Sequence, residues 1–175
     1  LDCYNQNGQI DSINLSQNSD LQFLDASGNT ITYLDLSNNP MLEYLRINFN
    51  QLSEIELSNN SFLKHIWMNN NNLTSLDLSN NHMLEYLGVN FNQLSEIDLS
   101  NKPNLASVFC EDNNISVLEL NNVPSLNSLW CSGNQISELD VLNKPNLEQL
   151  FAGDNLLTSL DLSSCGSLIW IWLYS

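Results

Sequence analysis

Positive charge is scarce in this chain of 175 residues, which has four Lys and Arg residues against twenty Asp and Glu residues and a formal net charge of −16. Nucleic acids and anionic lipid surfaces bind proteins through basic patches. The composition therefore argues against both classes of partner.

Long apolar runs are also missing from the sequence. The longest, Leu168–Tyr174, has seven residues, whereas a membrane-spanning helix needs about 20. With 42% hydrophobic residues the chain is nevertheless apolar enough, and long enough, for one globular or solenoid domain. No signal peptide is visible, but the chain begins inside a predicted strand, so we expect the natural protein to be longer.

Cysteine is infrequent and unpaired in the sequence. None of the four cysteines belongs to a Cys-x-x-Cys pair. Cys3, Cys110 and Cys131 occupy one core position of the repeat described below, and Cys165 lies in a turn. We interpret them as small buried apolar residues, with a disulfide or a metal site as the alternative.

What the chain does contain is a period of 21 residues, seen in the stretch LEYLGVNFNQLSEIDLSNKPN over Leu84–Asn104. Apolar residues recur at offsets 0, 3, 5, 10, 13 and 15 from the first Leu of each copy. The copies open at Leu21, Leu42, Leu63, Leu84, Leu105, Leu126, Leu147 and Leu168. Offset 8 is Asn in every complete copy: Asn29, Asn50, Asn71, Asn92, Asn113, Asn134 and Asn155. A fixed period of this length predicts a solenoid, in which each unit covers the apolar face of the next.

A single unit is too small to fold alone. Burial of six aliphatic side chains cannot offset the entropy lost by 21 residues of backbone, so each unit needs neighbours that add strand pairing and complete the burial. The Asn at offset 8 falls where the chain turns sharply inward, and its amide can satisfy backbone groups of its own and adjacent turns. Its removal should therefore cost more than a surface substitution.

The pattern LxxLxLxxNxL, as in Leu84–Leu94, resembles a leucine-rich repeat, and the continuation SEIDLSNKP resembles the short, 21-residue bacterial class of internalin-like proteins and surface proteins of anaerobes. The resemblance implies a right-handed superhelical solenoid of the α/β leucine-rich repeat type that is mostly β, with a parallel sheet on its concave side. It also implies a binding surface rather than a catalytic pocket. Cysteine often alternates with aliphatic residues at the offset-5 position of this class.

We expect one domain over residues 1–175, with about eight units. The first unit, 1–20, is irregular because Tyr4–Gln9 carries an insertion; regular units start at 21, 42, 63, 84, 105, 126 and 147, and a partial unit starts at 168. The return segments, such as Leu76–Ser79, are short and show a two-residue alternation. They predict short convex strands or extended turns and little helix.

The predicted concave face is rich in aromatic residues. Because a strand alternates its side chains, offsets 2 and 4 point outward while offsets 3 and 5 point into the core. Nine of the fifteen aromatic residues fall in these sixteen outward positions, where even scattering would place one or two. The predicted ligand-binding residues are Phe23, Tyr44, Arg46, His65, Trp67, Tyr86, Phe109, Trp130, Phe151, Trp170 and Trp172.

An outward row of aromatic side chains is typical of partner and ligand surfaces. The alternative is that the rings stabilise the sheet by contacting one another across strands. The leading hypothesis is a non-catalytic module that holds an extended protein or peptide segment, or a partner subunit. Alternatives are a glycan-binding surface, as in an accessory lipoprotein of an outer-membrane uptake system, and a spacer that projects another domain.

A second column, at offset 14, is acidic and should lie on the convex face. We interpret it as a solvated face that keeps the protein soluble, with weak divalent-cation binding as the alternative. Its members are Asn14, Asp35, Glu56, Asp77, Asp98, Glu119, Asp140 and Asp161.

Catalysis is not expected. The turn acids Glu111, Asp112 and Asp154 are the best candidates for a glycosidase-like carboxylate pair, but they would lie on an open surface. His65 and His82 occupy different offsets without a partner at metal-ligand spacing. The chain has no Gly-rich phosphate loop or nucleophile elbow, so no cofactor is expected.

The acidity, the abundance of Asn and the bacterial resemblance together favour an extracellular or cell-surface location. An outer-membrane lipoprotein and association with a cell-surface complex both fit this expectation. The ligand itself cannot be read from the sequence.

Overall fold

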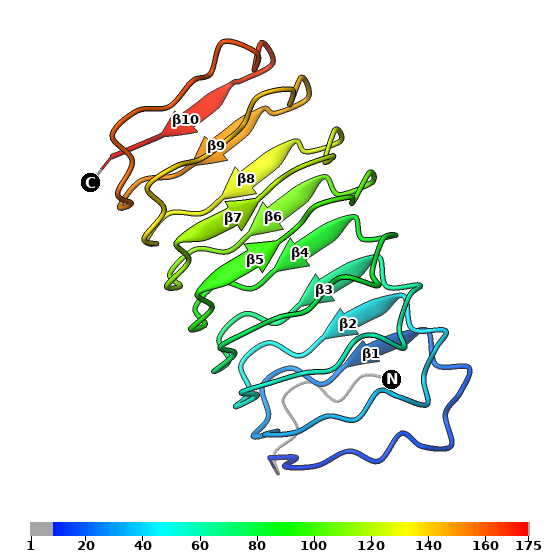
Figure 1. Cartoon of the computed structure of the whole chain (residues 1–175). Coiled ribbons are helices and arrows are strands. Elements are labelled where there is room, and N and C mark those ends of the chain that lie inside the picture. The colour runs from blue at the N-terminus through cyan, green and yellow to red at the C-terminus, as the bar shows by residue number, and fades with distance from the viewer. Residues whose placement is uncertain (1–8, 175) are drawn as a thin grey trace.

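The computed structural model describes residues 9–174 and shows a β-solenoid in which successive units stack one on the next (Figure 1). Residues 9–174 contain ten strands of three residues each. They are β1 (Phe23–Asp25), β2 (Tyr44–Arg46), β3 (His65–Trp67), β4 (Tyr86–Gly88), β5 (Glu96–Asp98), β6 (Ser107–Phe109), β7 (Val117–Glu119), β8 (Ser128–Trp130), β9 (Gln149–Phe151) and β10 (Trp170–Trp172). Over residues 9–174 there is no helix, hence none that could span a membrane.

Eight strands form one parallel sheet in the order β1-β2-β3-β4-β6-β8-β9-β10, with one strand from each unit. Equivalent residues of successive units pair directly, as Leu87 does with Val108 and Val108 with Leu129. The register therefore equals the period of the sequence, and every offset becomes a straight column along the solenoid. This arrangement confirms the predicted repeat solenoid with a parallel sheet.

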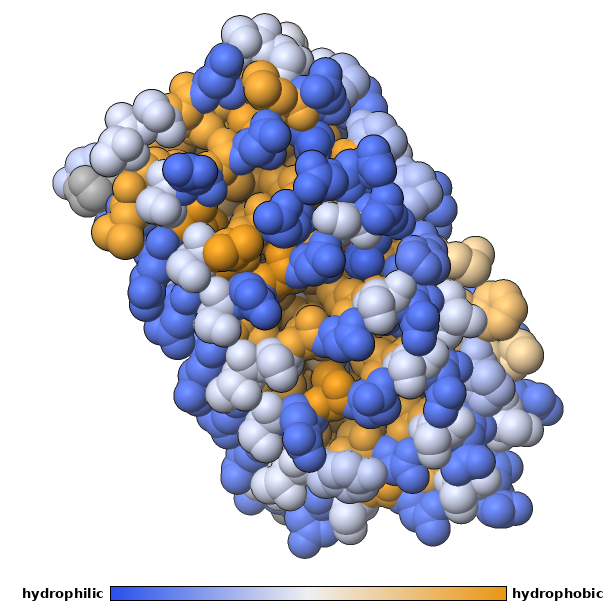
Figure 2. All heavy atoms as spheres, in the orientation of Figure 1, coloured by the Kyte–Doolittle hydropathy of each residue, from blue (hydrophilic) through white to orange (hydrophobic). Residues whose placement is uncertain are grey.

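The opposite side of the solenoid carries the return segments. Among the described residues, only β5 and β7 pair there, as a two-stranded parallel sheet, and the equivalent segments of the other units are extended but unpaired. Leu76–Ser79 is such a segment and ends in a turn. Figure 2 looks onto this side, where apolar side chains form a broken band between polar ones. In the return segments, Ile55, Leu76 and Leu160 are only partly buried.

The core lies between the two sides and consists of the six aliphatic offsets. In the central units these residues are almost fully buried, as with Leu87, Val89 and Leu129, each at 0% exposure. Cys110 and Cys131 are also buried in this core as free thiols, and Cys165 is buried under a turn, so the described cysteines match their interpretation as buried apolar residues. Cys3 and most of the predicted Tyr4–Gln9 insertion lie outside the described residues.

The Asn at offset 8 joins adjacent units, as predicted. In the fourth regular unit, Asn92 donates from Nδ2 to the carbonyl oxygens of Met68, Val89 and Asn90, and its Oδ1 accepts the N–H of Leu73 at 3.1 Å. One side chain thus satisfies backbone groups of two units. Since the backbone turns here and cannot pair within a ladder, the amide replaces the missing partners.

A second buried column, at offset 18, was not predicted. It begins with Asn39, Asn60 and Asn81, each at 0% exposure. Asn60 donates to the carbonyl oxygens of Leu36 (3.1 Å) and Asn39 (2.9 Å) in the unit before it. These Asn residues tie the second turn of each unit as those at offset 8 tie the first.

Lys102 replaces Asn in the next unit of this column. Its Nζ donates to the carbonyl oxygen of Leu78 at 3.1 Å, which is the equivalent acceptor. Burial lowers the pKa of Lys102, and the nearby carboxylates of Asp98 and Asp77 oppose that shift. Lys144 is buried two units further on and donates to the carbonyl oxygen of Leu142 at 3.2 Å. Two of the four basic side chains are thus used inside the fold.

The acidic column at offset 14 has a structural role in addition to its exposure. At every position except Glu119, the side-chain oxygen accepts the backbone N–H two residues further on, as Asp77 does from Ser79 at 2.8 Å. This hydrogen bond lowers the pKa of Asp77. Turn formation alone therefore accounts for the recurrence of acids here. Among residues 9–174 no group of three His, Cys, Asp or Glu side chains could hold a metal ion.

Candidate ligand-binding surface

All eleven predicted ligand-binding residues lie in strands of the eight-stranded sheet. From β1 to β9 the middle residue of each strand is buried, so the flanking residues point away from the core. We call this outward side, formed by offsets 2 and 4 of each unit, the sheet face. Because equivalent residues pair in register, as Phe109 does with Trp130 and Trp130 with Phe151, the aromatic residues lie in file.

The rings of the sheet face form one continuous series of contacts. The centroids of Tyr86 and Phe109 are 5.2 Å apart, those of Phe109 and Trp130 5.1 Å, and those of Trp130 and Phe151 4.5 Å. On the other side the series continues through Trp67, His65 and Tyr44 to Phe23. We call this series, from Phe23 to Phe151, the aromatic ladder.

Gly88 keeps the ladder continuous where an outward aromatic residue is missing. A Cβ at this position would lie 3.3 Å from Tyr86 Cε1 and 3.3 Å from Asn69 Nδ2. The Tyr86 ring uses this space to contact both Trp67, at 4.9 Å between centroids, and Phe109. Burial raises the pKa of the Tyr86 hydroxyl. A larger residue at Gly88 would have to move the ring that bridges the two halves of the ladder.

His65 is part of the ladder and is not an isolated surface residue. Its ring lies nearly parallel to those of Tyr44, 4.8 Å away, and Trp67, 5.4 Å away. Its Nε2 also lies 3.5 Å from a carboxylate oxygen of Glu85. The spacing in the sequence did not predict this partner for His65, because Glu85 comes from the next unit along the sheet. His82, by contrast, is exposed at the other side of its unit.

Trp170 and Trp172 differ from the other predicted residues. They belong to β10, which pairs with β9, but the ring contacts of the ladder end at Phe151 among the described residues. Their exposed fractions are 62% and 56%, whereas Trp67, Phe109 and Trp130 are partly buried against their neighbours. The aromatic columns are therefore one ladder plus a separate exposed pair.

A file of polar side chains lies at offset 6, just beyond the strands of the sheet face. Asn48 Oδ1 accepts the backbone N–H of Asn69, and Asn69 Oδ1 accepts that of Asn90, at 2.9 and 2.8 Å. Asn90 Oδ1 then accepts the N–H of Glu111 at 2.8 Å. These bonds fix the ends of the strands, so the rings are carried by a rigid backbone.

Glu111, one of the three turn acids predicted as the best catalytic candidates, is the last residue in this series of hydrogen bonds. Burial raises the pKa of its carboxyl group, and the neighbouring Asp112 raises it further. The Asp112 carboxylate lies over Gly133, where a Cβ would be 2.7 Å from Asp112 Oδ1. Glu111 itself accepts a bond from Asn90 Nδ2 at 3.2 Å. These contacts show that Glu111 packs against Asn90 and that Asp112 packs against Gly133.

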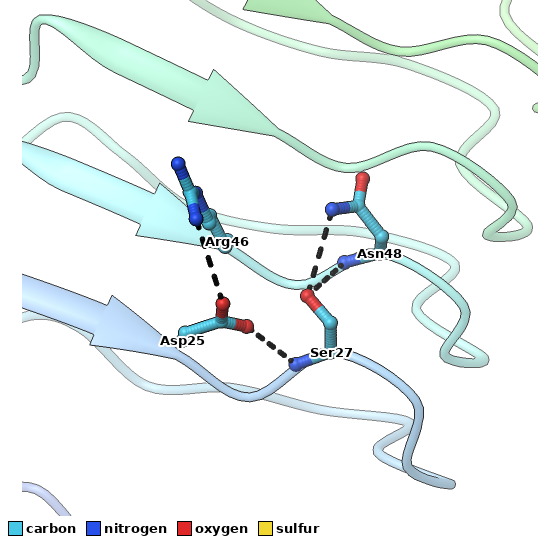
Figure 3. A network of polar contacts seen from close by, with 4 residues as sticks. All are labelled: Asp25, Ser27, Arg46 and Asn48. Carbon is cyan, nitrogen blue, oxygen red and sulfur yellow. Dashed lines mark hydrogen bonds and ion pairs between the residues drawn. The ribbon is translucent and has the colours of Figure 1, made fainter. Parts of the chain in front are cut away.

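The first part of the sheet face holds a polar cluster, shown in Figure 3. The Arg46 guanidinium lies over the Trp67 ring, with Cζ 4.4 Å from the centroid, and 5.7 Å from that of Phe23. Asp25 is 4.0 Å from Arg46 Nη1 and accepts the N–H of Ser27 at 3.1 Å. An open depression of about 370 Å³ lies among these side chains and is also bordered by Asn48 and Phe49.

Phe49 and Phe91 are exposed aromatic residues that were not predicted to lie on the surface. Both lie at offset 7, the turn after the strand, with positive φ angles of 54° and 56° and exposed fractions of 60% and 53%. The other units have Gly, Asn or Asp at this position, such as Gly28 and Asn70. A left-handed backbone is costly for a bulky residue, and exposed Phe gains little from burial. Large apolar residues at a turn position were the signal that could have identified them.

Replacement of Phe91 by Asn is expected to stabilise the protein by about 0.5–1 kcal/mol, because Asn adopts the left-handed conformation at lower cost. The same change at Phe49 should have a similar effect. Urea unfolding followed by circular dichroism measures both. Asn70→Phe is the reverse control and should destabilise; unchanged stability in all three variants would mean that no strain exists at this turn.

Known proteins were compared with the chain at the level of sequence and of structure. No protein-family profile and no curated protein sequence matches it. Several solved structures have a similar fold. The functional domain of InlJ from Listeria monocytogenes is 25% identical and covers 93% of this chain and 41% of its own, with a TM-score of 0.71. An internalin (InlF) from Listeria monocytogenes is 27% identical and covers 90% of this chain and 49% of its own, with a TM-score of 0.81. YopM, a leucine-rich effector protein from Yersinia pestis, is 33% identical and covers 87% of this chain and 43% of its own, with a TM-score of 0.77.

This chain is a leucine-rich repeat protein of the short, 21-residue class. The leucine-rich repeat chain spans less than half the length of each of these three solved chains. The InlJ domain is described as including a cysteine ladder, and here Cys110 and Cys131 occupy the same core position of adjacent units. Burial raises the pKa of the Cys131 thiol to about 12 and raises that of Cys110 as well. Both thiols therefore stay protonated and act as core residues.

Proposed function

We propose that this leucine-rich repeat domain is a non-catalytic recognition module that binds an extended segment of another protein along the sheet face. The observation that carries the proposal is the aromatic ladder, a row of partly exposed rings on a rigid parallel sheet. Rigid aromatic anchors lose little entropy on binding and dominate the energy of protein interfaces. Leucine-rich repeat proteins of similar fold generally mediate binding between proteins, which supports the same function here.

The packing of the rings favours a peptide over a sugar. Neighbouring rings of the ladder are 4.5–6.2 Å apart, and in every pair except Phe109 and Trp130 the two ring planes are inclined by 40° or less, so the ring faces largely cover one another along the solenoid. A sugar ring stacks on a free aromatic face, whereas the ladder presents ring edges and the gaps between them. Apolar side chains of an extended peptide fit such gaps, with one contact per unit of about 4.8 Å.

The proposal extends to location and partner. The net charge of −16 and the similarity to internalins support a module that acts outside the cytoplasm, at the cell surface or as a secreted protein. The partner is then a surface-exposed or secreted protein. An accessory role in binding glycans for uptake remains the competing hypothesis.

Replacement of Trp67, Phe109 and Trp130 by Ala in one variant tests the proposed function. Peptides are first selected from a phage-displayed library of linear heptapeptides on the unmodified protein, and their Kd values are then measured by fluorescence anisotropy. The triple variant should bind them at least about 30-fold more weakly, since interface anchors contribute about 2 kcal/mol or more each. The variant also loses five ring contacts, so at about 0.2–1 kcal/mol per pair its stability should fall by about 1–5 kcal/mol.

Tyr33→Ala is the matched control, because Tyr33 is an exposed aromatic residue, at 64%, outside the sheet face. It should leave the Kd values unchanged. Unchanged peptide binding by the triple variant, or a large loss of stability as its main effect, would show that the ladder serves only the sheet. Strong signals on a glycan array with quenching of tryptophan fluorescence would favour the competing hypothesis.

A further inference from the structure

Arg46 differs from every other basic residue of the chain in being available to a ligand. Lys64 Nζ lies 2.7 Å from a carboxylate oxygen of Glu43. Lys102 and Lys144 are buried and donate to backbone carbonyl oxygens. Arg46, the single arginine, has a side chain that is 44% exposed and lies on the sheet face.

The Arg46 guanidinium is held in position, but no described residue accepts a hydrogen bond from it. The Trp67 ring supports it from one side, 4.4 Å from Cζ. Its one ionic neighbour, Asp25, is 4.0 Å away, which exceeds the length of a hydrogen bond. Within residues 9–174 no side-chain or backbone oxygen accepts a hydrogen bond from Arg46. The guanidinium, with its five N–H donors, therefore borders the depression, and none of these donors is hydrogen-bonded to an oxygen of residues 9–174.

The depression beside Arg46 has room for a side chain. It encloses about 370 Å³ and is bordered by Arg46, Trp67, Phe49, Asn48, Ser27 and Asp25. Phe49 is exposed and adopts a left-handed backbone conformation that favours glycine or Asn. Phe49 thus gives the depression an exposed apolar wall beside the guanidinium.

We propose that this depression, the Arg46 site, binds the carboxylate of one Asp or Glu side chain in the protein segment that lies along the aromatic ladder. The inference rests on the proposed function and adds the chemistry of the segment. A guanidinium supported by an aromatic ring presents two parallel N–H groups that match the two oxygens of a carboxylate. The rest of the segment is apolar or basic, because the twenty acidic residues of this chain repel a partner with many negative charges.

The position of the site also sets the direction of the segment. Arg46 lies in β2, whereas Phe109, Trp130 and Phe151 follow in β6, β8 and β9. An acidic residue at one end of the segment and apolar residues towards the other would therefore fix its polarity on the sheet. A segment without the acidic residue could bind in either direction and more weakly.

The test starts from the selected heptapeptides and compares each with a synthetic twin in which the acidic residue is replaced by its amide. For the unmodified protein the acidic peptide should bind at least about tenfold more tightly than its twin, since a charge-assisted hydrogen bond contributes about 1.5–3 kcal/mol. In Arg46→Gln the ratio should fall to about one. Because Arg46 is the single arginine, its Nε–H gives one arginine side-chain signal in a ¹⁵N-correlated NMR spectrum, and only the acidic peptide should shift it strongly.

Two further variants separate a local site from the overall charge. Lys64→Gln removes the same charge one unit away and should keep the tenfold ratio. Asp25→Asn removes the competing carboxylate and should tighten binding of the acidic peptide several-fold, because the Asn oxygen can still accept the N–H of Ser27. Equal loss of the ratio in Lys64→Gln and Arg46→Gln would overturn the proposal, since long-range charge would then explain it.

The remaining outcomes distinguish this inference from the proposed function. Peptides that need Trp67, Phe109 and Trp130 but show no preference for an acidic residue would overturn the Arg46 site and leave the proposed function intact. If no selected peptide needs these three rings, both fall together. A shift of the Arg46 signal by oligogalacturonate, with no effect of any acidic peptide, would overturn the proposal in favour of an acidic glycan.

Discussion

Replacement of Asn113 by Ala is expected to lower the free energy of unfolding by about 3 kcal/mol or more. Asn113 is 8% exposed, accepts the N–H of Leu94 at 3.1 Å, and donates to the carbonyl oxygens of Val89, Cys110 and Glu111. Ala leaves these backbone groups without a partner in a region that water does not reach freely. Each buried group left unsatisfied costs about 1–3 kcal/mol, so the loss exceeds that of a typical surface substitution by several-fold.

The adjacent residue provides the control. Asn114 is exposed, and no hydrogen bond of its side chain is seen within residues 9–174, so Asn114→Ala should change stability by less than about 0.5 kcal/mol. Equilibrium unfolding in urea, followed by both circular dichroism and tryptophan fluorescence, measures the two variants. Similar small effects for both would show that solvent readily replaces the amide and that the offset-8 column does not hold the units together.

Leu129→Ala is expected to destabilise the protein by about 3–4 kcal/mol, whereas Ile171→Ala at the same offset should cost less than about 1 kcal/mol. Leu129 is fully buried in β8, between Val108 of β6 and Leu150 of β9. Ile171 occupies the equivalent place in β10, pairs with β9 alone, and is 49% exposed. Truncation of a buried Leu loses the transfer energy of three carbons and leaves a cavity, but an exposed Ile leaves none.

The comparison tests the central property of a solenoid, that burial comes from neighbouring units. Both residues have the same local sequence pattern, so a model in which each unit buries its own apolar residues predicts equal effects. Urea unfolding of the 175-residue chain decides between the two. Equal destabilisation by Leu129→Ala and Ile171→Ala would contradict burial by stacking.

The repeat solenoid was predictable because its signals are local and recur many times. A column such as Leu24, Leu45 and Ile66 repeats at a constant spacing, and a parallel sheet in register requires just such a spacing. The offset-8 Asn could be assigned to a turn for the same reason. The lack of helix within residues 9–174 followed from return segments that are too short and too polar to form one.

The buried column at offset 18 was not predicted because its residue type changes along the chain. Asn81 is followed there by Lys102 and then by Val123, yet all three are buried. The common feature is the acceptor: Asn81 and Lys102 each donate to the carbonyl oxygen 24 residues earlier. Pattern analysis compares residue types and cannot recognise that an amide and an ammonium serve the same carbonyl oxygen.

The sequence by itself determined the period, the parallel register and the division of each strand into an inward and an outward side. These features follow from the two-residue alternation of a strand and from a spacing that brings equivalent residues into contact. Only the tertiary structure decided how the outward side chains contact one another: that Tyr86 fills the space at Gly88, that His65 lies between Tyr44 and Trp67, and that Arg46 rests on Trp67. Such contacts depend on side-chain rotamers, and those of Tyr44 with His65 and of Arg46 with Trp67 also depend on a side chain of the next unit, 21 residues away; the residue pattern of a single unit specifies neither.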